Sequence, residues 1–82
     1  MDEGQKIKQF TKYITKIIMP KFPDILGFNI SYKGSVGIDA YLFWFHMDGT
    51  EDEIEFDIQD EILQMRDLFG ETFVAWFEYE TY

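Results

Sequence analysis

The spacing of apolar residues changes along this chain, and each change limits the folds that the chain can adopt. In the first segment apolar residues recur at intervals of three and four: Ile7, Phe10, Ile14, Ile17 and Ile18. This is the period of an amphipathic helix, and it predicts one from about Gln5 to Met19. We expect Pro20 and Pro23 to end it, because proline lacks an amide hydrogen and disfavours helical geometry in the residue before it.

After Gly27 the apolar period becomes two, which is typical of strands. Four segments are predicted to be strands, residues 28–32, 38–47, 53–58 and 71–82, and all but the second show this alternation. The second segment is apolar on both faces, so we expect a central strand that is covered on both sides. Asp48 and Gly49 follow it and predict a tight hairpin, which makes the second and third strands antiparallel.

A second helical pattern lies between the third and fourth strands. Its apolar residues are Ile58, Ile62, Met65 and Phe69. Asp57 or Asp60 is suited to cap the amide end of this helix, and Gly70 is suited to the left-handed residue that follows its carboxyl end.

These elements predict an α+β fold in one small domain, residues 1–82. The order α-β-β-β-α-β gives an antiparallel sheet of about four strands with two helices on one face. The alternative is a longer acidic second helix that includes residues 50–58, which gives α-β-β-α-β. Ile54, Phe56 and Ile58 alternate with acidic residues, and this composition favours the strand.

An 82-residue chain has room for one core, and the absence of cysteine means that neither disulfides nor thiolate metal sites stabilise it. Aromatic residues make up 20% of the chain, enough for large core side chains. No apolar stretch approaches the roughly 20 residues of a membrane span. The first residues also lack the pattern of a signal peptide, so we expect a cytoplasmic protein.

The charge is distributed unevenly. Residues 1–47 carry six lysines against four carboxylates, a net charge of +2, whereas residues 48–82 carry one arginine against twelve carboxylates, a net charge of −11. A negative field repels nucleic acid and anionic membranes and attracts basic surfaces. We therefore expect a basic protein partner, with no direct binding to nucleic acid or membrane.

Acidic residues cluster in the segment that follows Gly49. The candidate partner-binding residues are Glu51, Asp52, Glu53, Glu55, Asp57, Asp60 and Glu61. On a strand, Glu53, Glu55 and Asp57 point the same way at intervals of about 6.7 Å. Such a row resembles a run of phosphates and suits a basic groove. The alternative is a solvated surface that protects an edge strand from aggregation.

A sheet covered by helices on one face leaves the other face open. We expect it to expose some of the following aromatic residues: Tyr41, Phe43, Phe45, Trp76 and Tyr82. An exposed aromatic patch of this size usually marks an interface, although these rings could also pack in the core. Modules that stack nucleic-acid bases surround such rings with lysine and arginine. Here Glu78 and Glu80 are the neighbours, so we include both in the candidate protein-binding surface.

The residue pattern predicts no catalytic, metal or cofactor site. His46 is the one histidine, and no serine or cysteine motif supplies partners for a triad. The carboxylates near Gly49 lack the spacing of a calcium loop, and the glycines form no phosphate-binding loop. We expect a protein that is not an enzyme and has no catalytic residues, metal ligands or cofactor.

These observations favour a small acidic protein-binding module, in particular an inhibitor that presents carboxylates to a nuclease or another DNA- or RNA-binding protein. A phage counter-defence protein that mimics nucleic acid and an immunity protein against a toxin nuclease both fit. The alternative is a homodimeric or chaperone-like structural module that associates through the aromatic sheet face.

Overall fold

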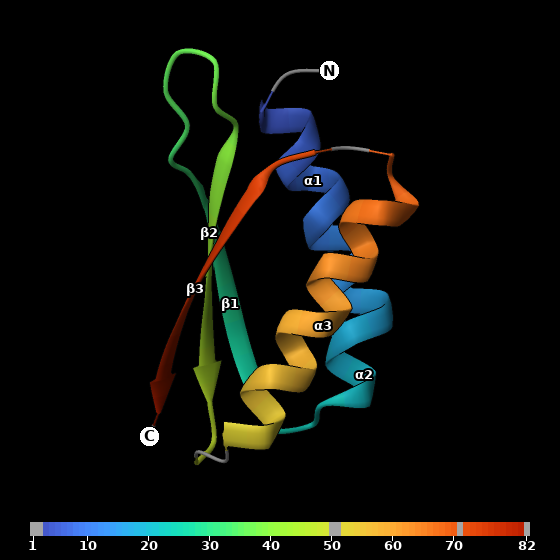
Figure 1. Cartoon of the computed structure of the whole chain (residues 1–82). Coiled ribbons are helices and arrows are strands. Elements are labelled where there is room, and N and C mark those ends of the chain that lie inside the picture. The colour runs from blue at the N-terminus through green and yellow to red at the C-terminus, as the bar shows by residue number, and fades with distance from the viewer. Residues whose placement is uncertain (1–2, 50–51, 71, 82) are drawn as a thin grey trace.

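The computed structural model describes residues 3–49, 52–70 and 72–81. In these ranges the chain is a small compact α+β domain, with a three-stranded mixed sheet and two helical segments packed on one of its faces (Figure 1). The first helical segment consists of α1 (Glu3–Tyr13), a π-helical turn η1 (Ile14–Ile18) and α2 (Met19–Lys21). The strands are β1 (Ile25–Tyr32), β2 (Ala40–Met47) and β3 (Val74–Thr81), and α3 (Asp52–Leu68) connects β2 to β3.

The predicted first helix is confirmed, but it continues through Pro20 and ends at Lys21. The π-helical turn explains how the helix accommodates this proline. The Met19 amide donates to the carbonyl of Ile14, five residues back, so the backbone is wider here than in an α-helix. A wider turn relieves the clash that a proline ring has with the preceding turn of an α-helix.

The sheet has the order β1-β2-β3. β1 and β2 are antiparallel, with a register shift between Ile25 and Gly27, whereas β2 and β3 are parallel with an unbroken register from Ala40↔Val74 to Met47↔Thr81. The expectation of an entirely antiparallel sheet of about four strands is therefore wrong. The helix between β2 and β3 returns the chain to the end of the sheet at which β2 begins, so β3 runs in the same direction as β2.

Residues 52–58 belong to α3, which corrects the prediction of a strand there and selects the order α-β-β-α-β. Ile54 and Ile58 fit either period, but they also continue the four- and three-residue spacing of Ile62 and Met65. Ile58, Ile62 and Met65 are completely buried against the sheet. Phe56, which the strand pattern needed on the inner face, is 65% exposed.

The chain after β2 also differs from the predicted hairpin. Gly49 adopts a positive φ of 84°, yet the bend at Asp48 and Gly49 leads toward α3 and makes no turn to a neighbouring strand. At the other end of α3, Gly70 has a φ of 64°, and this confirms the predicted left-handed residue after the helix.

The core lies between the sheet and the helices. Phe10, Ile14 and Ile18 extend into it from the first helical segment, and Tyr41, Phe43, Phe45 and Met47 from β2. β2 is the central strand, as predicted, but in the described residues helices cover only one of its faces. Trp44 points to the other face and is 41% exposed. None of the helices described in these ranges is long and apolar enough to cross a membrane.

Candidate protein-binding surface

The face of the sheet opposite the helices carries two exposed tryptophans. Successive side chains of a strand alternate between faces, so Trp44 lies opposite Phe43 and Phe45, which are buried under the helices. Trp76 of β3 is opposite Leu42 in the register and is 51% exposed. Apolar surface is therefore exposed across β2 and β3.

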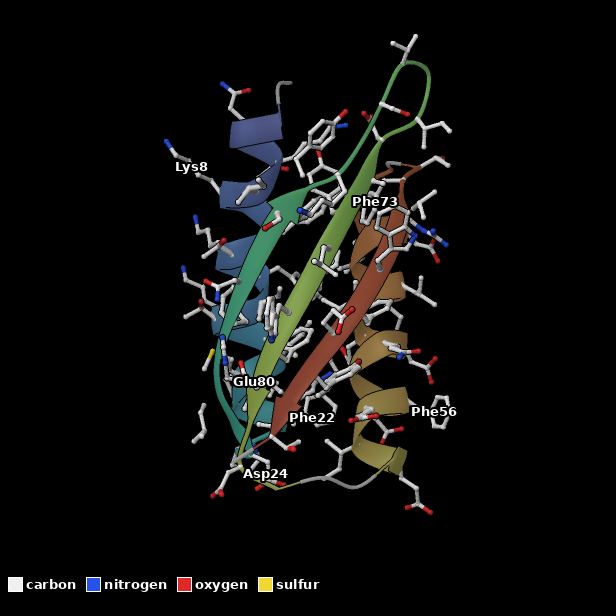
Figure 2. The ribbon with its side chains drawn as sticks, turned by 90° about the vertical axis from the view of Figure 1, so that its left-hand side faces the viewer. Lys8, Phe22, Asp24, Phe56, Phe73 and Glu80 are labelled. Atoms are coloured by element: carbon white, nitrogen blue, oxygen red, sulfur yellow. The ribbon has the colours of Figure 1, made fainter. Side chains whose placement is uncertain are left out.

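Carboxylates border these tryptophans. Glu78 is opposite Trp44, and Glu80 is opposite His46 in the parallel register, so all four side chains share the open face. Figure 2 views the molecule from this side. We call Trp44, Trp76, Glu78 and Glu80 the open-face patch.

His46 joins the three strands across this face. Its Nδ1 lies 3.2 Å from Oε2 of Glu80 on β3, and its Nε2 lies 3.2 Å from Nδ2 of Asn29 on β1. In the tautomer protonated on Nδ1, His46 donates to the glutamate and accepts from the asparagine amide. The imidazole also stacks on Trp44, with the ring planes 14° apart. These contacts hold the indole and Glu80 in position.

A second acidic surface covers the outward side of α3. Glu53, Asp57, Asp60 and Asp67 are exposed there, at the spacing of one helix face. Glu61 differs, because its Oε1 lies 3.0 Å from Nζ of Lys21 and it is only partly exposed. Lys21 therefore neutralises one of these carboxylates.

Glu55 lies on the side of α3 that faces β3. Its carbonyl accepts a hydrogen bond of 3.1 Å from the Tyr79 hydroxyl. Burial raises the pKa of Tyr79 from 10.0 to about 12; the nearby charge of Glu55 also raises it, and a hydrogen bond with the Gln59 side chain opposes the shift. The Glu55 side chain is half-buried next to this tyrosine.

The predicted row of carboxylates is therefore absent. Because residues 52–58 are helical, Glu53 and Asp57 share the outward face of α3 while Glu55 turns toward β3. Asp52 is the first residue of α3, and Glu51 lies outside the described residues. The open face of the sheet, to which Glu78 and Glu80 belong, is the face away from α3 (Figure 1).

The expected exposure of the β2 aromatics is wrong. Tyr41, Phe43 and Phe45 are each at most 1% exposed and pack under the helices. Trp76 is exposed as expected, and Tyr82 lies outside the described residues. The sequence interpretation missed Trp44, although its alternation with Phe43 and Phe45 placed it on the opposite face from them.

Exposed apolar residues on α3 were also missed, among them Phe56 and Leu63. Phe56 is 65% exposed and Leu63 is 37% exposed. Leu63 borders a shallow hollow of about 530 Å³ next to the start of β3, which Val74 and Arg66 also line. The signal for Phe56 was its position outside the stripe formed by Ile54, Ile58 and Ile62.

One lysine of the first helical segment, Lys21, pairs with a carboxylate of α3, Glu61. Lys8, Lys12 and Lys16 are exposed on the first helical segment, and Lys8 lies on the opposite flank from Phe56 (Figure 2). Across the described ranges, no group of three or more acidic or histidine side chains is arranged to hold a metal ion.

In comparisons with protein families, curated proteins and solved structures, no match was found.

Proposed function

We propose that this protein is a small acidic module that binds a basic protein partner through the open-face patch. The observation that carries the proposal is the exposure of Trp44 and Trp76, on the uncovered face of the sheet, beside Glu78 and Glu80. Tryptophan is among the residues that contribute most to protein interfaces, because it buries a large rigid surface.

The charge determines the kind of partner. Carboxylates next to the indoles and a net charge of −9 favour a basic surface and oppose a polyanion. The outward carboxylates of α3 add to the long-range field that attracts such a partner, even though they lie on another side. Association should therefore be fast at low salt and slower at high salt.

Among basic proteins, the class of partner that fits this chemistry is a nucleic-acid-binding protein, because it presents a basic groove. We propose that the module inhibits such a protein in the cytoplasm, as a counter-defence nucleic-acid mimic or an immunity protein does. Helical placement of Glu53 and Asp57 removes the regular carboxylate row from this proposal. The inhibitor role now depends on the open-face patch and on net charge.

The second candidate is a homodimer that buries Trp44 and Trp76 against the same face of another copy. The exposed indoles favour it, since burial of apolar surface stabilises association. Charge opposes it, because Glu78 and Glu80 of both copies and two net charges of −9 would approach each other. We therefore rank it below a basic partner.

The experiment measures affinity for a panel of purified nucleases and DNA-binding proteins at roughly 0.1 M and 1 M salt, between which the Debye length falls from about 10 Å to about 3 Å. We expect binding that weakens with salt and falls at least about tenfold in Trp76→Ala, the loss typical of an interface hot spot. The paired variant Glu78→Gln with Glu80→Gln should lose affinity as well.

The matched control is Glu53→Gln with Asp57→Asn, which has the same net charge as the sheet-face pair but changes the outward side of α3. It should slow association modestly and leave the dissociation rate unchanged. Equal losses of affinity in the two paired variants would contradict the assignment of the contact to the open-face patch. A self-associated chain whose dimer resists salt and dissociates in Trp76→Ala would establish the homodimer instead.

A further inference from the structure

We propose that the free edge of β3 accepts an extended basic segment of the partner as a fourth strand of the sheet. This inference rests on the proposed function, because it specifies how the basic partner binds beside the open-face patch. Addition of a strand to a sheet edge is a common form of peptide recognition, in which the main chain supplies affinity and alternate side chains supply specificity.

The backbone of β3 is suited to this pairing. β3 is an edge of the three-stranded sheet over the described residues, and it is eight residues long with an unbroken register to β2. The Val74 amide donates to the carbonyl of Asp39, on the β2 side, at 2.8 Å. Backbone groups alternate in direction along a strand, so those of Ala75, Phe77 and Tyr79 point toward the free edge.

The other edge of the sheet is less suited to it. β1 has a register shift between Ile25 and Gly27, and irregularities of this kind protect an edge from pairing. On the open face β1 presents Asn29 and Ser31, which offer little apolar surface. β3 is therefore the regular edge, and it is also the edge with an exposed tryptophan.

On the open-face side of β3, an added strand would meet Trp76, Glu78 and Glu80. These residues occupy alternate positions on one face, so they would contact alternate residues of the incoming segment. The indole is half-exposed and suits an apolar or aliphatic contact. The two glutamates suit lysine or arginine.

On the helix side of β3, the same segment would meet the flank of α3. Gln59 bonds to Tyr79, and Arg66 donates to the Phe73 carbonyl at 2.9 Å, so this flank of the helix faces β3. Phe56 and Leu63 lie on the same stripe, three or four residues from Gln59. Both are exposed, and Figure 2 shows Phe56 projecting outward from the flank of α3.

Carboxylates lie on both sides of this edge. Glu55 lies beside Tyr79 on the helix-covered face of the sheet, whereas Glu78 and Glu80 lie on the open face. An extended segment with alternating basic and apolar residues therefore matches the surface in charge and in period. A second copy of β3 would introduce its own glutamates and a further net charge of −9, so charge favours the basic segment over self-pairing.

The test uses a synthetic peptide of alternating lysine and valine, with as many residues as β3. Hydrogen exchange of the isotope-labelled protein should show new protection at the amides of Ala75, Phe77 and Tyr79 when this peptide is added. A peptide of alternating glutamate and valine should give no protection. Protection at the outer amides of β1 instead, or at neither edge, would overturn the inference.

The matched variants are Ala75→Pro and Ala75→Gly. Proline removes the edge amide and obstructs a neighbouring strand, whereas glycine retains the amide. We expect Ala75→Pro to weaken binding of the lysine-valine peptide at least about tenfold relative to Ala75→Gly. The exchange measurement on the unaltered chain decides the question if the proline variant does not fold.

The same variants separate this inference from the proposed function. Suppose that Ala75→Pro binds the basic proteins of the panel as tightly as Ala75→Gly, while Glu78→Gln with Glu80→Gln remains defective. Strand addition is then wrong and the proposed function stands. If the unaltered chain binds neither the basic proteins nor the peptide, both proposals are wrong.

Discussion

Phe10 is the side chain whose removal should destabilise this fold most. It is 1% exposed and contacts four other rings, with centroid distances of 5.2 Å to Tyr41, 5.9 Å to Phe43, 6.1 Å to Phe69 and 5.1 Å to Phe73. These residues come from β2, from the turn after α3 and from the segment before β3. Phe10 therefore connects the first helical segment to the rest of the core.

The expected magnitude follows from this packing. Replacement of a buried phenylalanine by alanine costs about 3–5 kcal/mol, and the loss of several ring pairs places Phe10→Ala near the upper end. A chain of this length has a free energy of unfolding of roughly 4–12 kcal/mol. We therefore expect Phe10→Ala to lose a large part of its stability, and Phe10→Leu to lose less because more of the volume is retained.

Urea denaturation followed by circular dichroism measures this difference. The control is Phe56→Ala, which makes the same chemical change at a side chain that is 65% exposed. It should change the free energy of unfolding by less than about 1 kcal/mol. If both alanine variants lose little stability, the burial assigned to Phe10 is wrong. If both lose several kcal/mol, the exposure of Phe56, and with it the helical placement of residues 52–58, is wrong.

Three further variants test local features. Stability should fall as pH rises from about 10 to 12, because unfolded chains release the Tyr79 proton in this range while the folded state, with the raised pKa, retains it. The full shift corresponds to about 2.7 kcal/mol. Partial exposure reduces this loss of stability to about 1 kcal/mol. Tyr79→Phe should not show this loss, and urea denaturation of the two proteins at several pH values measures the difference. Gly34→Ala should destabilise by roughly 1–3 kcal/mol, because the new Cβ would lie 2.6 Å from the Ile38 carbonyl oxygen. Gly27→Ala, whose Cβ would meet nothing within 4 Å, should be neutral or stabilising by thermal denaturation.

Much of the secondary structure was predictable because it depends on local spacing. Ile7, Phe10, Ile14 and Ile18 identified the first helix. The run of apolar residues around Trp44 identified β2, and the alternation around Trp76 identified β3. Gly70 was suited to its left-handed conformation because it has no Cβ. The acidic character of the second half follows from composition alone.

The segment from Ile54 to Ile58 shows where local spacing was insufficient. Two isoleucines four residues apart fit one face of a strand and one face of a helix equally well. The helix forms because Ile54 and Ile58 then align with Ile62 and Met65 over the sheet. That preference arises from contacts between segments distant in sequence, which a local pattern does not contain.

The candidate surface was likewise determined partly by local spacing and partly by contacts between distant segments. The sequence determined that Trp44 lies on the opposite face of β2 from Phe43 and Phe45, because strand geometry alternates. Only the tertiary structure decided which face the helices cover. Once α3 formed, it joined β2 to a parallel β3, covered the phenylalanines, and left both tryptophans exposed beside Glu78 and Glu80. Burial of one face is a property of how the layers pack, whereas alternation is a property of the backbone of each strand.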